Sequence, residues 1–270
     1  HSGMVKVTSS HLRFGLRLPG DNSEYIGNLF RTRFPADSCE PIPLAGRCRL
    51  RTRDYQKKKD SSMPRIEPLA EADAQDKTAQ TYGRIREMLG SETVPEPFLH
   101  YGRVQPFLQD FYMNFKKFVY TDGKIDAQTK AIIGLAVSSH YGCGLWLDFL
   151  IERAKSLGVT DGQVGEVIAV ASTNAMYNNF FKFRNFSGSD IFSEMPVGLR
   201  AHTFTSTSLT DQTVELINVA ISNLNACKPC TSAHVEKSRQ LGLSDEALLE
   251  AIQCAATMGA GCAFLKAAGV

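Results

Sequence analysis

The sequence of 270 residues lacks the features that mark several large classes of protein. No run of apolar residues approaches the ~18 that a membrane span requires, so we expect no integral membrane protein. Neither sign of charge dominates, because 30 Lys and Arg stand against 28 Asp and Glu. This balance disfavours both a disordered chain and a nucleic-acid-binding protein.

The small charge imbalance that exists is concentrated at the start of the chain. Residues 1–62 hold 12 basic and 6 acidic side chains, whereas residues 63–270 hold 18 and 22. We therefore expect residues 1–62 to be a basic, poorly structured leader and residues 63–270 to form the globular body. The seven cysteines are odd in number and unevenly spaced, which favours a reducing compartment such as the cytoplasm. An organelle is the alternative if the leader is a transit peptide.

No segment alternates apolar and polar residues for long enough to indicate a strand, and the body is predicted to be all-α. Ala79, Tyr82, Ile85 and Leu89 recur at helical spacing, and Gly90 is placed to end that helix. The stretch 97–120 predicts one or two further helices, with an aromatic stripe that is typical of a core, made up of Phe107, Phe111, Phe115 and Phe118.

An internal repeat organises the rest of the body. The order of an apolar helix, a cysteine, a Leu-Gly turn and a second apolar helix occurs at about residues 126–172 and again at about 211–256, shifted by 84 positions. In both copies a Ser or Thr followed by Asp, at 160–161 and 244–245, is positioned to cap the second helix. The preceding glycines suit left-handed turns.

The two copies differ in the residues that could carry chemistry. The shift of 84 positions places Ala131, Trp146 and Leu150 opposite three polar residues of the second copy, which are Glu215, Cys230 and His234. Cys143 alone keeps a counterpart, at Cys227. We therefore interpret the first copy as a degenerate scaffold and the second as the catalytic copy.

The second copy contains the motif Cys227-Lys228-Pro229-Cys230, followed four residues later by His234. Proline is favoured in the first turn of a helix, so a helix is predicted to begin near Lys228 with Cys230 in its first turn. His234 then lies on the same face as Cys230. The helix dipole and the imidazole both favour a thiolate at Cys230.

Cys227 lies within disulfide reach of Cys230 and could attack a sulfenic acid formed there. Glu215 precedes Cys227 by twelve residues on an apolar helix, and a turn at 223–226 would fold it back toward the thiols as a proton carrier. Half of a zinc site is one alternative, but no second cysteine pair follows at the required spacing. A thioredoxin motif is another, but that fold needs a strand where residues 214–223 have helical spacing. No metal or cofactor is expected.

The spacing from Glu215 through Cys227 and Cys230 to His234 resembles that of the alkylhydroperoxidase D (AhpD) family, within the carboxymuconolactone decarboxylase superfamily. The stretches 175–186 and 196–200 resemble the segment between the two repeats of AhpD-like proteins, so the likeness covers about residues 100–270. Some relatives have a histidine where this chain has Pro229, so a relay through that histidine cannot operate here.

The resemblance implies an all-α, two-repeat antioxidant enzyme, a thiol-dependent peroxidase that reduces organic hydroperoxides. It implies that Cys230 is the peroxidatic thiol, that Cys227 is the resolving thiol, and that Glu215 and His234 relay protons. It also implies a dihydrolipoyl-type dithiol reductant or a peroxiredoxin partner, and a homo-oligomer, with a trimer favoured. Neither a nucleic acid nor a membrane is an expected partner.

Two other functions remain open from the sequence. A carboxymuconolactone decarboxylase-type enzyme would act on small cyclic acids without a redox cysteine pair, and the Cys-x-x-Cys motif at 227–230 disfavours it. A protein thiol–disulfide exchange factor would use the same two cysteines with another protein as its substrate. Peroxide consumption in the presence of a dithiol donor distinguishes the three.

Overall fold

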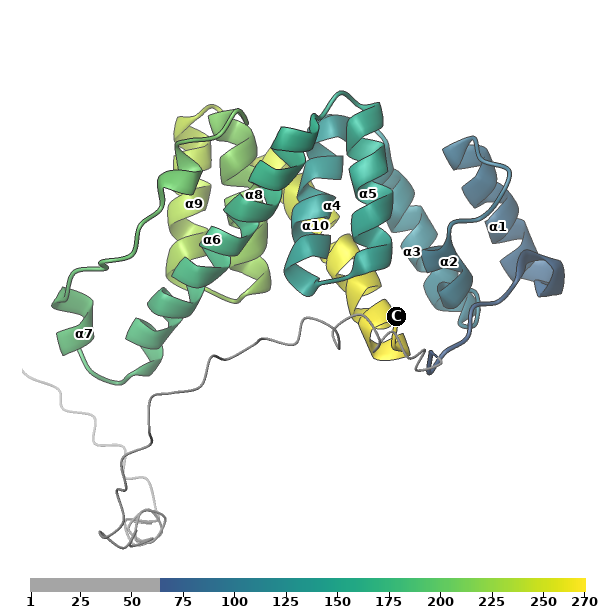
Figure 1. The fold of residues 1–270 in the computed structure, drawn as a ribbon, viewed down its shortest axis with the longest axis horizontal. Coiled ribbons are helices and arrows are strands. Elements are labelled where there is room, and N and C mark those ends of the chain that lie inside the picture. Colours follow the sequence, from purple (N-terminus) through teal and green to yellow (C-terminus); the bar gives the residue numbers. More distant parts are fainter. Residues whose placement is uncertain (1–63) are drawn as a thin grey trace, which may run out of the picture. The chain divides into compact units, whose positions relative to one another are not determined.

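The computed structural model describes residues 64–270, and within that range it contains helices and no strand. The all-α prediction is therefore confirmed for this part of the chain (Figure 1). The predicted leader, together with Cys39 and Cys48, lies outside the described residues.

The helices follow one another with short connections, except for the long segment between α6 and α8. Their bounds are η1 Glu71–Asp73, α1 Asp76–Leu89, α2 Glu96–Tyr101, α3 Gln105–Phe115, η2 Lys116–Tyr120, α4 Ala127–Tyr141, α5 Gly144–Ser156, α6 Asp161–Phe186, α7 Ile191–Glu194, η3 His202–Phe204, α8 Asp211–Leu224, α9 Lys228–Gln240 and α10 Asp245–Ala268. The turn η2 is a π-helix, which continues α3 with a wider winding.

The repeat predicted from the sequence corresponds to two sets of three helices, α4–α5–α6 and α8–α9–α10. Thr160 caps α6 and Ser244 caps α10, each side chain accepting a hydrogen bond from the backbone N–H three residues on. Gly158 and Gly242 precede these caps with positive φ angles, as the sequence predicted. Local signals therefore define the helix boundaries of both copies.

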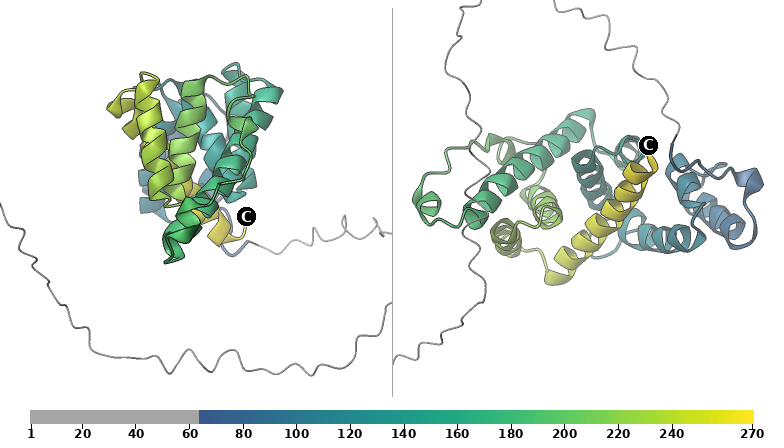
Figure 2. Two further views of the ribbon diagram at one scale, coloured as in Figure 1. Left: turned by 90° about the vertical axis from the view of Figure 1, so that its left-hand side faces the viewer. Right: turned by 90° about the horizontal axis from the view of Figure 1, so that it is seen from below.

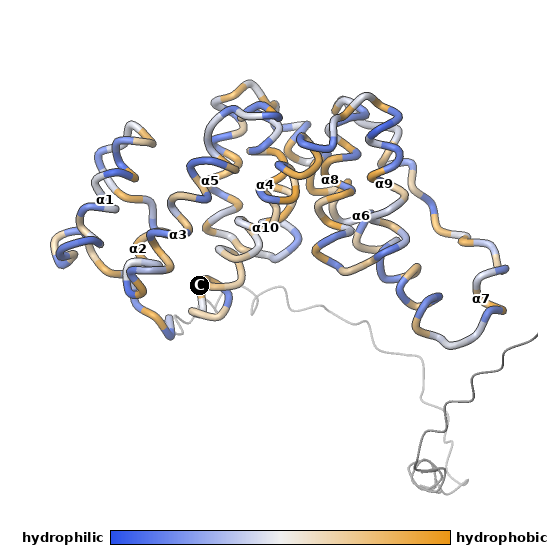
Figure 3. Tube along the Cα trace, turned by 180° about the vertical axis from the view of Figure 1, so that it is seen from behind, coloured by the Kyte–Doolittle hydropathy of each residue, from blue (hydrophilic) through white to orange (hydrophobic). Residues whose placement is uncertain are grey.

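The central helices α4 and α8 pack against each other, and each also contacts both α6 and α10. Figure 3 shows that hydrophobic residues concentrate on α4, α8 and α10. The exposed helix α9 is more polar, which agrees with its position outside this core (Figure 3).

The aromatic stripe predicted near Phe111 forms much of the core around α5. Phe111 and Phe115 are buried beside Trp146, with ring centroids 5.5 Å and 5.2 Å from its own. The Trp146 indole N–H donates to the Tyr101 hydroxyl at 2.7 Å, and that hydroxyl donates to the Gly261 carbonyl at 2.8 Å. Helices α2 and α3 thereby cover the face of α5 with aromatic side chains.

Helix α10 crosses the helical body from α9 to α2 and α3 (Figure 2). Its length and apolar composition would suit a membrane span, but 61% of its most apolar 18-residue window is buried among the other helices. Cys254 and Cys262 lie on its buried side, as small packed side chains. Its apolar character is therefore that of a core helix.

Candidate functional site

The two motif cysteines lie where the chain turns from α8 into α9. Cys227 is the N-cap residue of α9, Pro229 is in its first turn, and Cys230 follows directly. The helix start predicted from Pro229 is thus confirmed. The two cysteines are joined by a disulfide, with their Cα atoms 5.4 Å apart. Cys227 is fully buried, whereas Cys230 remains 7% exposed.

Helix α8 ends in a backbone motif that extends to Cys227, the buried first cysteine of the pair. The N–H of Ala226 donates to the Asn223 carbonyl at 2.9 Å, and the N–H of Cys227 donates to the Ser222 carbonyl at 3.0 Å. This pair of bonds is a Schellman motif, in which one residue adopts left-handed backbone angles. Ala226 fills that position with φ 52°.

Glu215 and His234 meet across the α8–α9 pair. The Nδ1 atom of His234 is 2.7 Å from Oε2 of Glu215, whose side chain is almost completely buried. The ammonium of Lys237, one turn beyond His234, donates to the other carboxylate oxygen at 2.8 Å. The carboxylate is therefore held from both sides by residues of α9.

The environment of Glu215 favours its ionised form. Burial is the largest influence and raises the pKa of this carboxyl group, but hydrogen bonds from His234 and Lys237, with the positive charges these residues can carry, outweigh it. The net pKa of Glu215 is lowered from its usual value. Since an ionised carboxylate only accepts hydrogen bonds, a proton on Nδ1 of His234 satisfies Oε2.

Cys230 and His234 line the same small pocket. Its volume is about 300 Å³, and aromatic side chains of α6 and η3 form much of its wall: Tyr177, Phe181 and Phe204. Pro229 and Ala233 complete the lining. The pocket is mainly apolar, and the exposed part of Cys230 faces an apolar space rather than a polar one.

The structure brings together all four residues that the sequence selected, namely Glu215, Cys227, Cys230 and His234. In this disulfide form the hydrogen bonds of His234 go to Glu215 and to Asn174, whose Nδ2 atom lies 3.5 Å from Nε2. Sequence reasoning missed both Asn174 and Lys237. The position of Lys237, three residues after His234, could have indicated it, but no local signal indicates Asn174, sixty residues away.

The corresponding positions of the first copy are filled by apolar side chains. Ala131, Trp146 and Leu150 are all buried, and Cys143 occupies the N-cap of α5 as Cys227 does that of α9. A hydrogen bond with the Cys262 thiol lowers the pKa of Cys143 from its usual value. A thiol is present in this copy, but these positions supply neither a carboxylate nor an imidazole to it.

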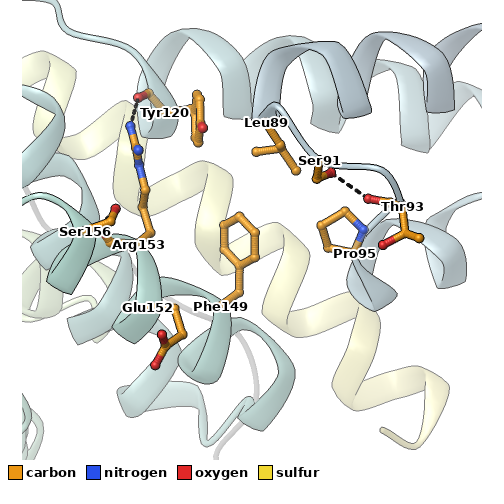
Figure 4. Close-up of a pocket in the computed structure, with 9 residues that line it drawn as sticks. All are labelled: Leu89, Ser91, Thr93, Pro95, Tyr120, Phe149, Glu152, Arg153 and Ser156. Carbon is orange, nitrogen blue, oxygen red and sulfur yellow. Dashed lines mark hydrogen bonds between the residues drawn. The ribbon is translucent and has the colours of Figure 1, made fainter.

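A second pocket of about 440 Å³ lies between α5 and the connection from α1 to α2 (Figure 4). Arg153 lies over the ring of Tyr120, 4.2 Å from its centroid, and also donates to the Tyr120 carbonyl. The ring of Phe149 points into the same space, and the lining contains no cysteine or histidine. This pocket offers no redox group.

Two stretches of the chain, residues 106–185 and 192–270, match the sequence pattern of the carboxymuconolactone decarboxylase family. Together they cover more than half of the chain, so the chain belongs to this family. The first stretch contains α4–α6 and the second contains α8–α10, which confirms the two-repeat helical fold.

Individual relatives carry the name alkyl hydroperoxide reductase AhpD. The protein from Anaeromyxobacter sp. (strain Fw109-5) is 29% identical over 124 residues, which are 46% of this chain and 66% of that protein. The one from Corynebacterium kroppenstedtii is 32% identical over 108 residues, or 40% and 62% of the two chains. This chain therefore spans less than two thirds of the length of either relative. The resemblance to AhpD-like proteins is confirmed.

Proposed function

We propose that this protein is a thiol-dependent peroxidase that reduces organic hydroperoxides through Cys230 and Cys227. The observation that carries the proposal is that Cys230 and His234 line one apolar pocket, with Cys227 joined to Cys230 and the buried Glu215 bonded to His234. The names of the AhpD relatives agree with it. An apolar pocket favours an organic hydroperoxide over hydrogen peroxide, because the alkyl or aryl group of the organic substrate can be buried there.

The reaction begins with the reduced pair. His234 takes the proton of the Cys230 thiol, and the thiolate attacks the outer oxygen of the hydroperoxide. The O–O bond breaks, Cys230 becomes a sulfenic acid, and the alkoxide leaves as an alcohol after receiving the proton from His234. The Cys227 thiol then attacks the Cys230 sulfur, which closes the disulfide and releases water. A dithiol reductant reduces the disulfide to two thiols and is itself oxidised to a disulfide.

Exposure and helix position assign the two cysteine roles. Cys230 is the one that reaches the pocket, and it lies in the first turn of α9, where the positive end of the helix dipole stabilises a thiolate. Cys227 is fully buried behind it, protected from peroxide but within bonding distance. In a reducing compartment such as the cytoplasm this pair would be returned to its thiol form after each cycle.

The test is peroxide consumption by the reduced protein with cumene hydroperoxide and dihydrolipoamide. We expect turnover by the parent and by Cys254→Ala, which removes a buried thiol of α10 outside the site. Cys227→Ser should consume one equivalent of peroxide and label with dimedone at Cys230. Cys230→Ser should form no sulfenic acid at a comparable rate. A label on Cys227 in Cys230→Ser, with none on Cys230 in Cys227→Ser, would reverse the assignment.

Two further activity measurements on the same proteins test the alternative functions. A protein that does not consume peroxide but reduces disulfides in an unfolded protein substrate would be a thiol–disulfide exchange factor. Turnover of a small cyclic lactone acid that survives Cys230→Ser would indicate the decarboxylase-type reaction. Either result would overturn the peroxidase proposal.

We also propose that the protein forms a homo-oligomer, with a trimer favoured. Large apolar side chains are exposed toward the end of α6 and on α7, namely Phe183, Phe186 and Ile191. Exposed apolar clusters of this kind are typical of protein–protein contacts. Sedimentation equilibrium of the parent and of Phe186→Glu tests this proposal, and a parent that remains monomeric at micromolar concentration contradicts it.

A further inference from the structure

The side of His234 that faces away from Glu215 contacts a buried polar network between α6 and α8. Its central members, Asn174, Asn178, Asn218 and Ser222, have no exposed surface. Burying four polar side chains is costly unless they hydrogen-bond, and each of them bonds to another member, although Nδ2 of Asn218 has no partner among the described residues. The network also reaches Asn225 at the end of α8.

The hydrogen bonds of this network run in one direction. Asn225 donates to Oδ1 of Asn178 at 3.0 Å, and Nδ2 of Asn178 donates to the Ser222 hydroxyl at 3.0 Å. A serine hydroxyl has one hydrogen, and Ser222 donates it to Oδ1 of Asn174, also at 3.0 Å. The amide of Asn174 is therefore oriented, with its oxygen toward Ser222 and its NH₂ group on the opposite side.

The oriented NH₂ group of Asn174 faces three acceptors. One N–H donates to Oδ1 of Asn218 at 2.7 Å, and the Nδ2 atom also lies 3.3 Å from the backbone carbonyl oxygen of Asn218 and 3.5 Å from Nε2 of His234. An N–H can face a ring nitrogen favourably only when that nitrogen has a lone pair. On the opposite side of the ring, Nδ1 of His234 faces the ionised carboxylate of Glu215 and needs a proton.

We propose that Asn174 is a positioning residue that keeps Nε2 of His234 unprotonated and fixes the orientation of the ring. The proton is kept on Nδ1, and Nε2 retains its lone pair as the base that receives the Cys230 proton. The contact of 3.5 Å is long, so the lone pair is oriented without being consumed by a strong hydrogen bond. Side-chain amides do not titrate near neutral pH, so the network sets geometry and does not conduct protons. The role of Nε2 as the base for Cys230 rests on the proposed peroxidase function, but the protonation pattern of the His234 ring does not.

The direct test is ¹⁵N NMR of the histidine ring in the reduced, full-length protein. In the parent at neutral pH, His234 should show one protonated nitrogen, Nδ1, and one unprotonated nitrogen, Nε2. Asn174→Ala should show a larger fraction of His234 with both ring nitrogens protonated, because Glu215 still holds the proton on Nδ1 and Nε2 no longer faces a donor. Asn174→Asp presents an acceptor to Nε2, so both ring nitrogens should carry protons at pH 7.

Ser138→Ala is the matched control. It removes an equally buried serine at the position of the first copy that corresponds to Ser222, and its hydroxyl bonds to the Cys262 thiol rather than to the network, so a purely structural effect would appear here too. Asn174→Ala should lower kcat/KM about 10- to 100-fold and change the shape of the pH–rate profile, since a misplaced base costs rate in that range. Ser138→Ala should retain the His234 protonation pattern and the pH–rate profile of the parent.

Ser222→Ala provides a second route if Asn174→Ala does not fold. It removes the donor that orients the Asn174 amide, so the fraction of His234 with both ring nitrogens protonated should again rise. A single Nδ1 tautomer with an unchanged pH–rate profile in a folded Asn174→Ala or Ser222→Ala protein would overturn the proposal. A parent without peroxidase activity would instead refute the proposed function, and the NMR result would still decide the role of Asn174.

Discussion

Replacing Ala226 with glycine should stabilise the protein, although the position directly precedes a proposed catalytic cysteine. Ala226 has φ 52°, in the left-handed region that side chains with a Cβ atom rarely adopt. The matching residue of the first copy is Gly142, with φ 66°. Both residues close their helix with the same pair of backbone hydrogen bonds, since Cys143 donates to the Ser138 carbonyl as Cys227 does to that of Ser222. The two turns therefore form a natural control pair.

The size of the effect follows from two opposing contributions. A residue with a Cβ atom in the left-handed region costs about 1–2 kcal/mol. Glycine relieves that cost but loses about 0.5–1 kcal/mol through the greater freedom of its unfolded chain. Ala226→Gly should therefore raise the free energy of unfolding by roughly 0.5–1 kcal/mol. Gly142→Ala should lower it by about the same amount, because a Cβ atom placed there meets no other atom within 4 Å.

Urea unfolding followed by circular dichroism measures both changes, with the disulfide kept oxidised so that only the backbone differs. The double variant should return to nearly the parent stability, because the two turns are independent sites. If Ala226→Gly were neutral or destabilising while Gly142→Ala lost stability as expected, the left-handed strain assigned to Ala226 would be wrong. If both variants were neutral, the common turn geometry of the two copies would be wrong.

Three further predictions follow from the buried ionic groups. The lowered pKa of Glu215 means that its contribution to stability is complete above its usual pKa of 4.5 and is lost as the pH falls through the lower folded value. The difference in unfolding free energy between the parent and Glu215→Gln should therefore shrink on acidification, and a difference that stays constant from pH 7 to about pH 3 would contradict this. Lys237→Met should raise the pKa of Glu215 by less than about one unit, because Lys237 is 55% exposed and solvent screens its charge. A carboxyl ¹³C titration of Glu215 that shows no upward shift of its pKa would refute this prediction. Lys130→Met should destabilise the fold by about 3–5 kcal/mol, because it leaves the carboxylate of Glu250 without its buried partner. The double variant Lys130→Met/Glu250→Gln should recover part of that loss. Urea unfolding that shows no such recovery would contradict the pairing.

Sequence reasoning predicted the features that neighbouring residues determine. Pro229 located the start of α9, and Gly90 located the end of α1, because both residues act through the backbone conformation of one or two positions. The spacing of four residues between Cys230 and His234 was enough to place both on one face of a helix. The meeting of Glu215 with His234 was also predictable, since only a short turn separates their helices.

The features that the sequence did not reveal depend on contacts between distant helices. Asn174 reads as an ordinary polar residue of α6, and only the packing of α6 against α8 places it beside His234. The pair of Lys130 and Glu250 joins α4 to α10 across 120 positions, and nothing in either local sequence marks these residues as buried. The periodicity that predicts which face of a helix is apolar does not say which helix covers it.

The different surroundings of the two copies suggest why only one has an accessible site. In the first copy α3 places Phe111 and Phe115 over the residue that occupies the position of Cys230, which is Trp146. The equivalent face of α9 is covered only in part, by the aromatic wall of the 300 Å³ pocket beside Cys230. A closed aromatic core stabilises the first copy through the apolar area that it buries. The proposed thiolate of the second copy instead requires a pocket that a substrate can enter. The duplication thus allows packing and chemistry to be separated between two copies of the same three-helix unit.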